Sequence, residues 1–297
     1  MRTVSTLLLA LVASLLAACA SVPPPRFDDL LADRLFGPPT ETISTADVFT
    51  VDAAMQHYLS VDIAAQLRSK GSQTGLIDAL YKRSQLKLEY DSAKTKTAAE
   101  AFATRSGNCL SLVIMTAALA RELHLPVAYQ SAYLEETWSR SGDLMLASSH
   151  VNVTVGRPIA ASVGPRDLSL LTIDFLPAQE LRRMRTREIS ETTIVAMYAN
   201  NRAAEALSQG RVDDAYAWTR EALRQDPRYV GAYNTLGVVY LRRGRPAEAI
   251  VALSRALSIE PLNTRAMSNL AQGYQRAGRT AEADALRTRL AAIEPDP

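Results

Sequence analysis

The chain has 297 residues, of which 47% are hydrophobic, and its 33 basic and 31 acidic residues give a formal net charge of +2. This length allows two domains with sizeable cores, and the composition excludes wholesale disorder. The balanced charge also argues against a nucleic-acid partner, because such proteins neutralise many phosphates with an excess of lysine and arginine.

The N-terminal residues are typical of an export signal. Arg2 precedes an apolar stretch at residues 7–16, which is shorter than the ~20 residues that a membrane-spanning helix needs. The Leu-Ala-Ala-Cys sequence at residues 16–19 resembles the bacterial lipobox, in which the cysteine becomes the first mature residue and carries acyl chains. An ordinary secretory signal with a chance cysteine is the alternative.

The lipobox resemblance implies where the protein lies. Residues 1–18 would be a signal peptide, and acyl chains on Cys19 would anchor the protein in the bacterial cell envelope, facing the periplasm. Ala20 stands where an aspartate usually marks retention in the inner membrane, so the resemblance points to the outer membrane. Removal of the signal peptide leaves Cys109 as the only free thiol, either a buried core residue or a reactive one.

Residues 19–44 are expected to form a Pro-rich tether. The prolines at 23–25 and 38–39 favour a stiff, extended backbone, which would hold the following domain away from the membrane. Apolar side chains interrupt this segment at Phe27, Leu30, Leu31, Leu35 and Phe36. We therefore expect part of the tether to dock on the folded protein.

Residues 45–190 are predicted to form an α+β domain. Apolar residues recur every three or four positions in its first half, and the period then changes to two. The predicted helices are residues 48–58, 76–88, 97–102 and a segment that runs from Asn108 or Cys109 to Pro126. The predicted strands are residues 127–133, 151–155 and 168–175. Helices followed by strands, without βαβ alternation, indicate a mainly antiparallel sheet.

A basic cluster ends this domain. It consists of Arg182, Arg183, Arg185 and Arg187. We interpret it as a short, solvated helix between two domains, because a run of charges usually marks a solvated surface.

Residues 196–297 repeat with the 34-residue period of the tetratricopeptide repeat. Three columns are filled alike in every copy: Gly210, Gly244 and Gly278; Ala215, Ala249 and Ala283; and Pro227, Pro261 and Pro295. A small residue recurs at Ala203, Gly237 and Ala271, where two helices must touch closely. The pattern predicts an all-α solenoid of three helix–turn–helix repeats, residues 196–229, 230–263 and 264–297. Such a solenoid is a surface for holding a protein partner.

The segment around Cys109 resembles the nucleophile motif of the transglutaminase-like superfamily. Residues 97–111 read Thr-Ala-Ala-Glu-Ala-Phe-Ala-Thr-Arg-Ser-Gly-Asn-Cys-Leu-Ser, and in these papain-like folds the cysteine opens a helix after an Arg-x-Gly-x-Cys turn. The resemblance covers roughly residues 85–176. A sulfur in the first helical turn lies at the positive end of the helix dipole, which favours the nucleophilic thiolate. Gly107 permits a close approach, and Asn108 is expected to cap the helix, whose free N–H groups would form half of an oxyanion hole.

A nucleophilic thiol needs a base, and the chain has three histidines. We interpret His57 as a surface or core residue within a helix, and His124 lies at the far end of the Cys109 helix, too distant to act. His150 stands just before a predicted strand, where the family places its histidine, and Asp174 matches the residue that orients the imidazole. The resemblance therefore implies a catalytic triad of Cys109, His150 and Asp174. No metal or cofactor is expected.

The resemblance is incomplete at the second oxyanion donor. No glutamine or tryptophan stands near Cys109 where papain-type relatives supply one. Gln130 or a backbone group is left to fill this role.

Two classes of function remain open. The first is a cysteine protease or amidase that acts on a protein or peptide of the envelope; if an amine intercepts the acyl-enzyme, the same site is a transamidase. A peptidoglycan amidase would share this site. The second is an inactive, transglutaminase-like adaptor in which partner binding by the repeats is the main function. The residues implied to line the repeat groove are Asn200, Asn234, Gln272, Gln275 and Arg276.

Overall fold

The computed structural model describes residues 26–81, 86, 88–133, 139–141, 144–146, 150–156, 171–173 and 185–293. Cys19 and the expected signal peptide lie outside this part. The chain divides into two units, residues 1–31 and 32–297. In the first, the Asp29 carboxylate accepts a hydrogen bond from the Arg26 N–H (3.0 Å) and stabilises the start of η1 (Phe27–Leu30). No helix within the described ranges is both long and apolar enough to cross a bilayer.

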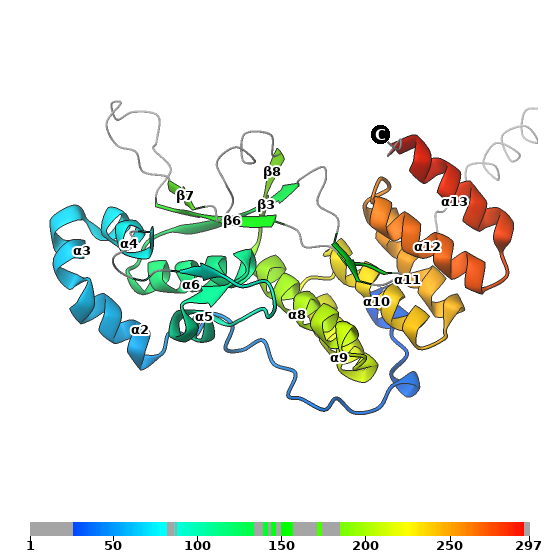
Figure 1. The fold of residues 1–297 in the computed structure, drawn as a ribbon, viewed down its shortest axis with the longest axis horizontal. Helices are drawn as coiled ribbons and strands as arrows, with labels where there is room; N and C mark the ends of the chain where they lie inside the picture. Colours follow the sequence, from blue (N-terminus) through cyan, green and yellow to red (C-terminus); the bar gives the residue numbers. More distant parts are fainter. Residues whose placement is uncertain are drawn as a thin grey trace, which may run out of the picture. The chain divides into compact units, whose positions relative to one another are not determined.

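The second unit begins with several short helices, which are followed by one long, buried helix, α6 (Figure 1). The elements, in chain order, are η2 (Asp33–Leu35), α2 (Ala53–His57), the π-helical η3 (Tyr58–Asp62), α3 (Ala64–Lys70), α4 (Ser72–Tyr81), β1 (Glu89–Tyr90), α5 (Ala98–Thr104), β2 (Ser106–Gly107) and α6 (Cys109–Glu122). Local caps fix two of the predicted helices. Thr97 and Glu100 form a capping box at the start of α5, and Asn108 caps α6.

The sheet that follows is antiparallel, as predicted. Its strands are β3 (Val127–Tyr133), β6 (His150–Val155), β7 (Leu171–Ile173) and β8 (Arg185–Ile189), in the order β7-β6-β3-β8. Between β3 and β6, β4 (Ser139–Ser141) pairs with β5 (Leu144–Leu146). Helix α6 packs against β6 on one side and α5 on another (Figure 1). Residues 109–120 of this helix are all buried for that reason.

The predicted helix at the basic cluster is wrong where the structure describes it. Arg185–Ile189 is strand β8, which pairs with β3, so that Arg187 lies opposite Ser131. Arg187 and Glu188 are exposed, and β8 is an edge strand of the sheet, where polar side chains can face water. The other two arginines of the cluster lie outside the described residues.

Six helices form the C-terminal repeats, as the 34-residue period predicts. They are α8 (Glu191–Ser208), α9 (Val212–Gln225), α10 (Val230–Arg242), α11 (Pro246–Ile259), α12 (Thr264–Arg276) and α13 (Thr280–Ile293). Gly210, Gly244 and Gly278 follow the first helix of each pair with φ of +74°, +72° and +73°. These left-handed turns explain the repeated glycine, since a Cβ is unfavourable there. Helix α8 begins at Glu191, before the predicted start of the first repeat.

Part of the expected tether is docked on the first two repeats. The Phe36 ring stacks on Tyr216 with ring centroids 3.8 Å apart. The Arg243 guanidinium lies over the Phe36 ring, 5.0 Å from its centroid. The Ala32 N–H donates to the Tyr216 hydroxyl (3.0 Å), which in turn donates to Asp33 (2.7 Å). Docking was expected, but its place on the repeats was not.

The docked segment continues to residue 45 through polar contacts with α8 and α9. Thr40 donates to Asp214 from both its N–H (2.5 Å) and its hydroxyl (2.6 Å). The Glu41 carboxylate accepts from Trp218 Nε1 at 2.9 Å, and Thr45 donates to Glu221 at 2.9 Å. Residues 32–45, which we call the N-terminal strap, are therefore part of the folded repeats rather than a free spacer.

Candidate active site

Cys109 is the first residue of α6 and is buried, with 5% of its surface exposed. It is a free thiol. Its helix begins there because the Asn108 side chain accepts a hydrogen bond from the Ser111 N–H (2.9 Å). Because that cap uses the Ser111 donor, Cys109 and Leu110 are the first-turn residues whose N–H groups the helix itself does not engage.

The cap is held by the segment that precedes α5. Asn108 donates from Nδ2 to the Thr95 hydroxyl (2.9 Å), and the Ser111 hydroxyl donates to Asn108 Oδ1 (2.9 Å). The Lys96 N–H donates to that same hydroxyl (2.8 Å). These bonds cross-link the turn before Cys109 to residues 95 and 96, so the position of the sulfur is fixed by several buried contacts.

Gly107 permits this arrangement. A Cβ at this position would lie 2.6 Å from Ser111 Cβ and 3.4 Å from its hydroxyl oxygen. Residue 107 also pairs with Tyr90 in the two-stranded β1–β2 sheet, so its backbone has little freedom to move away. Only glycine fits between this sheet and the first turn of α6.

Gly107→Ala is expected to destabilise the protein by about 2 kcal/mol, because the added methyl group forces Ser111 out of its hydrogen bonds. Urea unfolding measures the change. Gly37→Ala is the matched control: its Cβ would meet Asp213 at an ordinary 3.8 Å, so its effect should stay within about 0.5 kcal/mol. Equal stability of the two variants would show that the close approach has no energetic role.

Tyr90 pairs with Gly107 and so lies near the turn that precedes Cys109, a position that the sequence pattern does not predict. Most of its side chain is exposed; the partial burial that remains, and then the charge of Cys109, raise the pKa of Tyr90. Its β1 strand is only two residues long and gives no periodic pattern. Only the pairing of β1 with β2 brings it to the site.

His150 begins strand β6 and lies opposite Ala132, near the end of β3. Helix α6 has 14 residues and a length of about 21 Å. Strand β3 has 7 residues and returns over about 23 Å. The backbones of Cys109 and His150 are therefore at the same end of the helix–sheet pair, whereas His124 follows the far end of α6.

Asp174 lies outside the described residues. The residue before it, Ile173, ends β7 and pairs with Val153 of β6. The proposed roles of His150 and Asp174 are therefore predictions from the resemblance. Among the residues described, no three His, Cys, Asp or Glu side chains come together as metal ligands.

The predicted groove residues are on the first helices of the repeats. Asn200 is buried in α8. Asn269 Nδ2 donates to the side-chain Oδ1 of Asn234 (2.9 Å), which joins α12 to α10. Arg276 donates to the Leu241 carbonyl (2.9 Å). Strand β5 lies against α12, the helix that carries the other predicted groove residues, Gln272 and Gln275.

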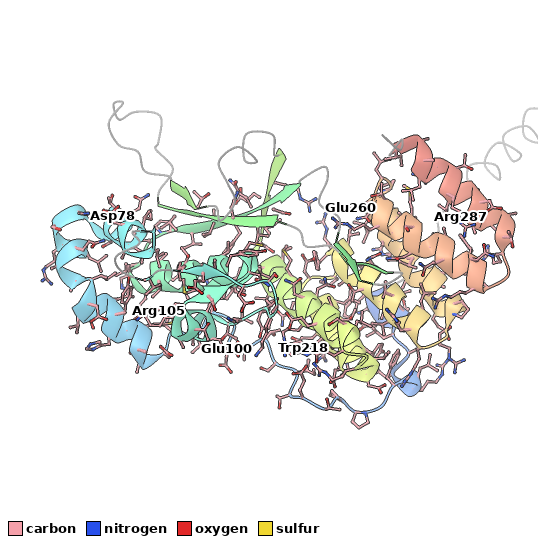
Figure 2. The ribbon with its side chains drawn as sticks, in the orientation of Figure 1. Asp78, Glu100, Arg105, Trp218, Glu260 and Arg287 are labelled. Carbon is pink, nitrogen blue, oxygen red and sulfur yellow. The ribbon has the colours of Figure 1, made fainter. Side chains whose placement is uncertain are left out.

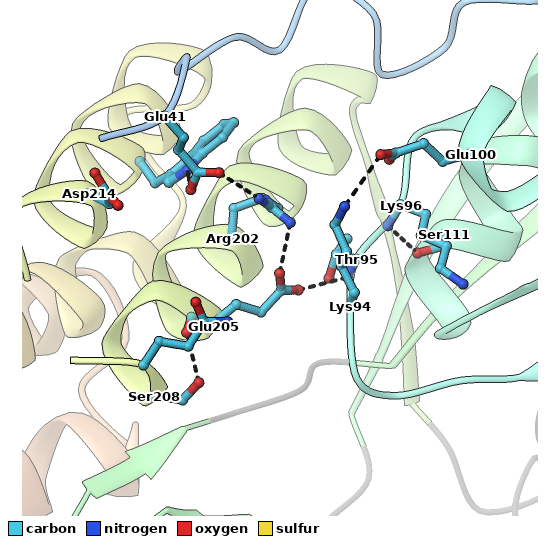
Figure 3. Close-up of polar contacts among 12 residues, drawn as sticks. Glu41, Lys94, Thr95, Lys96, Glu100, Ser111, Arg202, Glu205, Ser208 and Asp214 are labelled. Carbon is cyan, nitrogen blue, oxygen red and sulfur yellow. Dashed lines mark hydrogen bonds and ion pairs between the residues drawn. The ribbon is translucent and has the colours of Figure 1, made fainter. Parts of the chain in front are cut away.

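A chain of polar contacts joins the thiol turn to the strap (Figure 3). The Thr95 N–H donates to Glu205 on α8 (2.7 Å), Arg202 donates to Glu205 (3.0 Å), and Arg202 also donates to Glu41 (3.0 Å). Burial is the main cause that raises the pKa of Glu205. These contacts tie the Asn108 cap to the first repeat.

Comparison with known proteins agrees with both parts of the chain. The family model of the transglutaminase-like superfamily matches residues 61–160, and two tetratricopeptide repeat models match residues 218–251 and 240–297. A search of curated proteins found no match.

Among solved structures, the chain is similar to the N-terminal domain of stress-induced protein-1 (STI-1) from C. elegans. The two are 21% identical with a TM-score of 0.34, over 37% of this chain and 91% of that one. The family matches and the helix pairs agree with each other. The chain thus contains a transglutaminase-like domain followed by tetratricopeptide repeats, which form a protein-interaction module.

Proposed function

We propose that this protein is a cysteine protease or amidase of the bacterial cell envelope, acting on a protein or peptide that its repeats recruit. The observation that carries the proposal is the position of Cys109 as the first residue of α6, behind a rigid Asn108 cap. Lipidation of Cys19 and a place at the outer membrane, facing the periplasm, belong to the same proposal. They rest on the lipobox resemblance.

The reaction follows from the chemistry of a thiol beside an imidazole. The Cys109 sulfur attacks the amide carbon, its proton passes to His150, and first-turn N–H groups stabilise the oxyanion. His150 returns the proton to the leaving amine as the C–N bond breaks, which leaves a thioester. Water, deprotonated by His150, cleaves the thioester and restores the thiol. Asp174 orients the imidazole and stabilises its charged form.

The first test is the reactivity of Cys109. In the full chain with Cys19→Ser, which leaves a single thiol, we expect iodoacetamide to react at pH 6 at least tenfold faster than it reacts with glutathione, because the imidazole favours the thiolate. His150→Gln should remove this excess, whereas the matched variant His124→Gln should retain it. A reaction as slow as that of glutathione in the parent protein contradicts the proposed nucleophile.

The second test separates the reactions that the same site allows. Envelope proteins captured by Cys109→Ala are incubated with the parent protein, and new N-termini are identified by mass spectrometry. Incorporation of a fluorescent amine instead of new termini indicates transamidation, and release of fragments from purified sacculi indicates a peptidoglycan substrate. Absence of all three products contradicts an enzymatic role.

An adaptor is the second candidate, and the burial of Cys109 favours it, because a substrate must reach a sulfur that is only 5% exposed. In this case Cys109→Ala leaves the cellular phenotype of the protein unchanged, while substitutions at Asn200 and Arg276 abolish it. Labelled palmitate tests the anchor for either candidate, since Cys19→Ser should prevent its incorporation.

A further inference from the structure

A depression on the transglutaminase-like domain combines apolar walls with two hydrogen-bond donors that no described residue engages. It has a volume of about 530 Å³ and lies between α2–η3 and α5. Buried Ile63 and Leu86 contribute to its lining, and Phe102 packs edge-on against Tyr58 with ring centroids 5.3 Å apart. Arg105, labelled in Figure 2, also lines it. The volume is within the range of small-molecule sites.

The first unused donor is the Tyr58 hydroxyl. Tyr58 is 7% exposed, and its hydroxyl has no hydrogen-bond partner in the part of the chain that the structure describes. Burial, reinforced by the charge of Asp62, raises the pKa of Tyr58 to about 12, so the group remains a donor at neutral pH. A buried hydroxyl without a partner is unfavourable and rare. The oxygen itself is buried, so a ligand that accepts from it displaces part of the lining and then removes this deficit.

The second unused donor is the Arg105 guanidinium. Its side chain is exposed and forms no hydrogen bond or ion pair within the described residues, so it is free to bind a ligand. Its charge acts on Tyr58. The Arg105 backbone is left-handed, with φ of +51°, at a helix end where glycine is usual. Residues 58–62 form a π-helix, which is common at functional sites. Two unusual backbone segments therefore present side chains to one depression.

The remaining polar groups define the ligand further. His57 Nε2 lies 3.7 Å from an Asp62 carboxylate oxygen, and both side chains are exposed. The negative charge of Asp62 disfavours a multiply charged anion such as a phosphate, but its carboxylate can accept from an amide N–H. A single carboxylate suits the paired donors, because Arg and a hydroxyl bind it with charge-assisted hydrogen bonds.

We propose that this depression binds the C-terminal residue of a peptide with an apolar side chain. The terminal carboxylate accepts from the Tyr58 hydroxyl and the Arg105 guanidinium, the side chain packs against Ile63, Leu86 and Phe102, and the amide N–H donates to Asp62. The site does not include Cys109, so it stands whether or not that thiol is a nucleophile.

Titration calorimetry of the full chain with N-acetyl-L-phenylalanine tests the proposal. We expect saturable binding, and N-acetyl-L-phenylalaninamide, which lacks the carboxylate, should bind at least tenfold more weakly. Arg105→Gln should weaken binding of the acid at least tenfold and leave binding of the amide little changed. Arg68→Gln, an exposed arginine on the neighbouring α3, is the matched control and should bind as the parent does.

Tyr58→Phe separates a ligand donor from a structural hydroxyl. Because the hydroxyl has no hydrogen-bond partner among the described residues, we expect this variant to keep or raise the melting temperature while it binds the acid several-fold more weakly. A lowered melting temperature with unchanged affinity would show that the hydroxyl serves the fold and would overturn its assigned role. Equal affinity for acid and amide, or no saturable binding in the millimolar range, would overturn the ligand class.

Discussion

Gly237→Ala is expected to destabilise the protein by about 2 kcal/mol, the net of an overpacked core and a small gain in helix propensity. Gly237 lies in α10, and a Cβ there would overlap Leu253 Cγ and lie 2.7 Å from Leu253 Cδ2. Leu253, in α11, is fully buried and has no room to turn away. The two helices of the second repeat would therefore have to separate. Urea unfolding of the full chain measures the loss.

The other repeats explain why glycine is needed only here. The corresponding positions hold Ala203 and Ala271, and the residues that correspond to Leu253 are Thr219 and Arg287. The glycine is thus matched to the bulk of Leu253 rather than to the repeat as such. In the double variant Gly237→Ala with Leu253→Ala, the added methyl group enters space that the leucine vacates. We expect the double variant to lose at least about 1 kcal/mol less stability than the sum of the losses in the two single variants. Strict additivity would show that no clash exists.

Glu41→Gln is expected to lower stability by about 2 kcal/mol and to loosen the N-terminal strap. The Glu41 carboxylate accepts from Trp218 (2.9 Å), Arg211 (3.1 Å) and Arg202 (3.0 Å), and the Arg202 side chain is only 12% exposed. The amide of glutamine offers one acceptor in place of two and no charge, so the buried Arg202 guanidinium loses one of its two carboxylate partners and keeps only Glu205. Glu122→Gln, an exposed position on α6, is the matched control and should be neutral.

The effect of Glu41→Gln should depend on pH. Burial is the largest single influence on Glu41 and by itself raises its pKa, but hydrogen bonds from Trp218 and Arg211 and the charges of Arg202 and Arg211 hold the pKa below its ordinary value. A carboxyl group with a lowered folded-state pKa stabilises the fold above its unfolded pKa, near 4.5, and this contribution is lost as pH falls through the folded pKa.

The stability difference between parent and Glu41→Gln should therefore be full at pH 7 and shrink below about pH 4.5. Hydrogen exchange of residues 32–45 at pH 7 should accelerate in the variant, while exchange in α12 should not. A difference that stays constant down to pH 3 would mean that the carboxylate charge is not what holds the strap.

The parts of the fold that follow from short stretches of sequence were predictable. The repeats were found because the same backbone turn recurs, and each copy needs a glycine at the left-handed position, as at Gly244. The α6 start was found because a cap and its helix are neighbours in sequence, as Asn108 and Ser111 are. The helix predicted at the basic cluster is wrong at Arg185 and Arg187 because a run of charges has no period of its own. Pairing with the distant strand β3 makes Arg185–Ile189 a strand.

The sequence by itself determined the two-part organisation, the repeats, the antiparallel sheet and the residue types around Cys109, because each of these depends on local caps, turns or periodicity. The tertiary structure decided what joins them. Arg202 and Glu41 are 161 positions apart in sequence, and Thr95 and Glu205 are 110 apart. Tyr58 and Arg105 are also distant in sequence, and only the tertiary structure brings them to one depression. The sequence around a carboxylate or a guanidinium does not indicate which distant residue it pairs with. The contacts between the strap, the first repeat and the turn before Cys109 are therefore visible only in the tertiary structure.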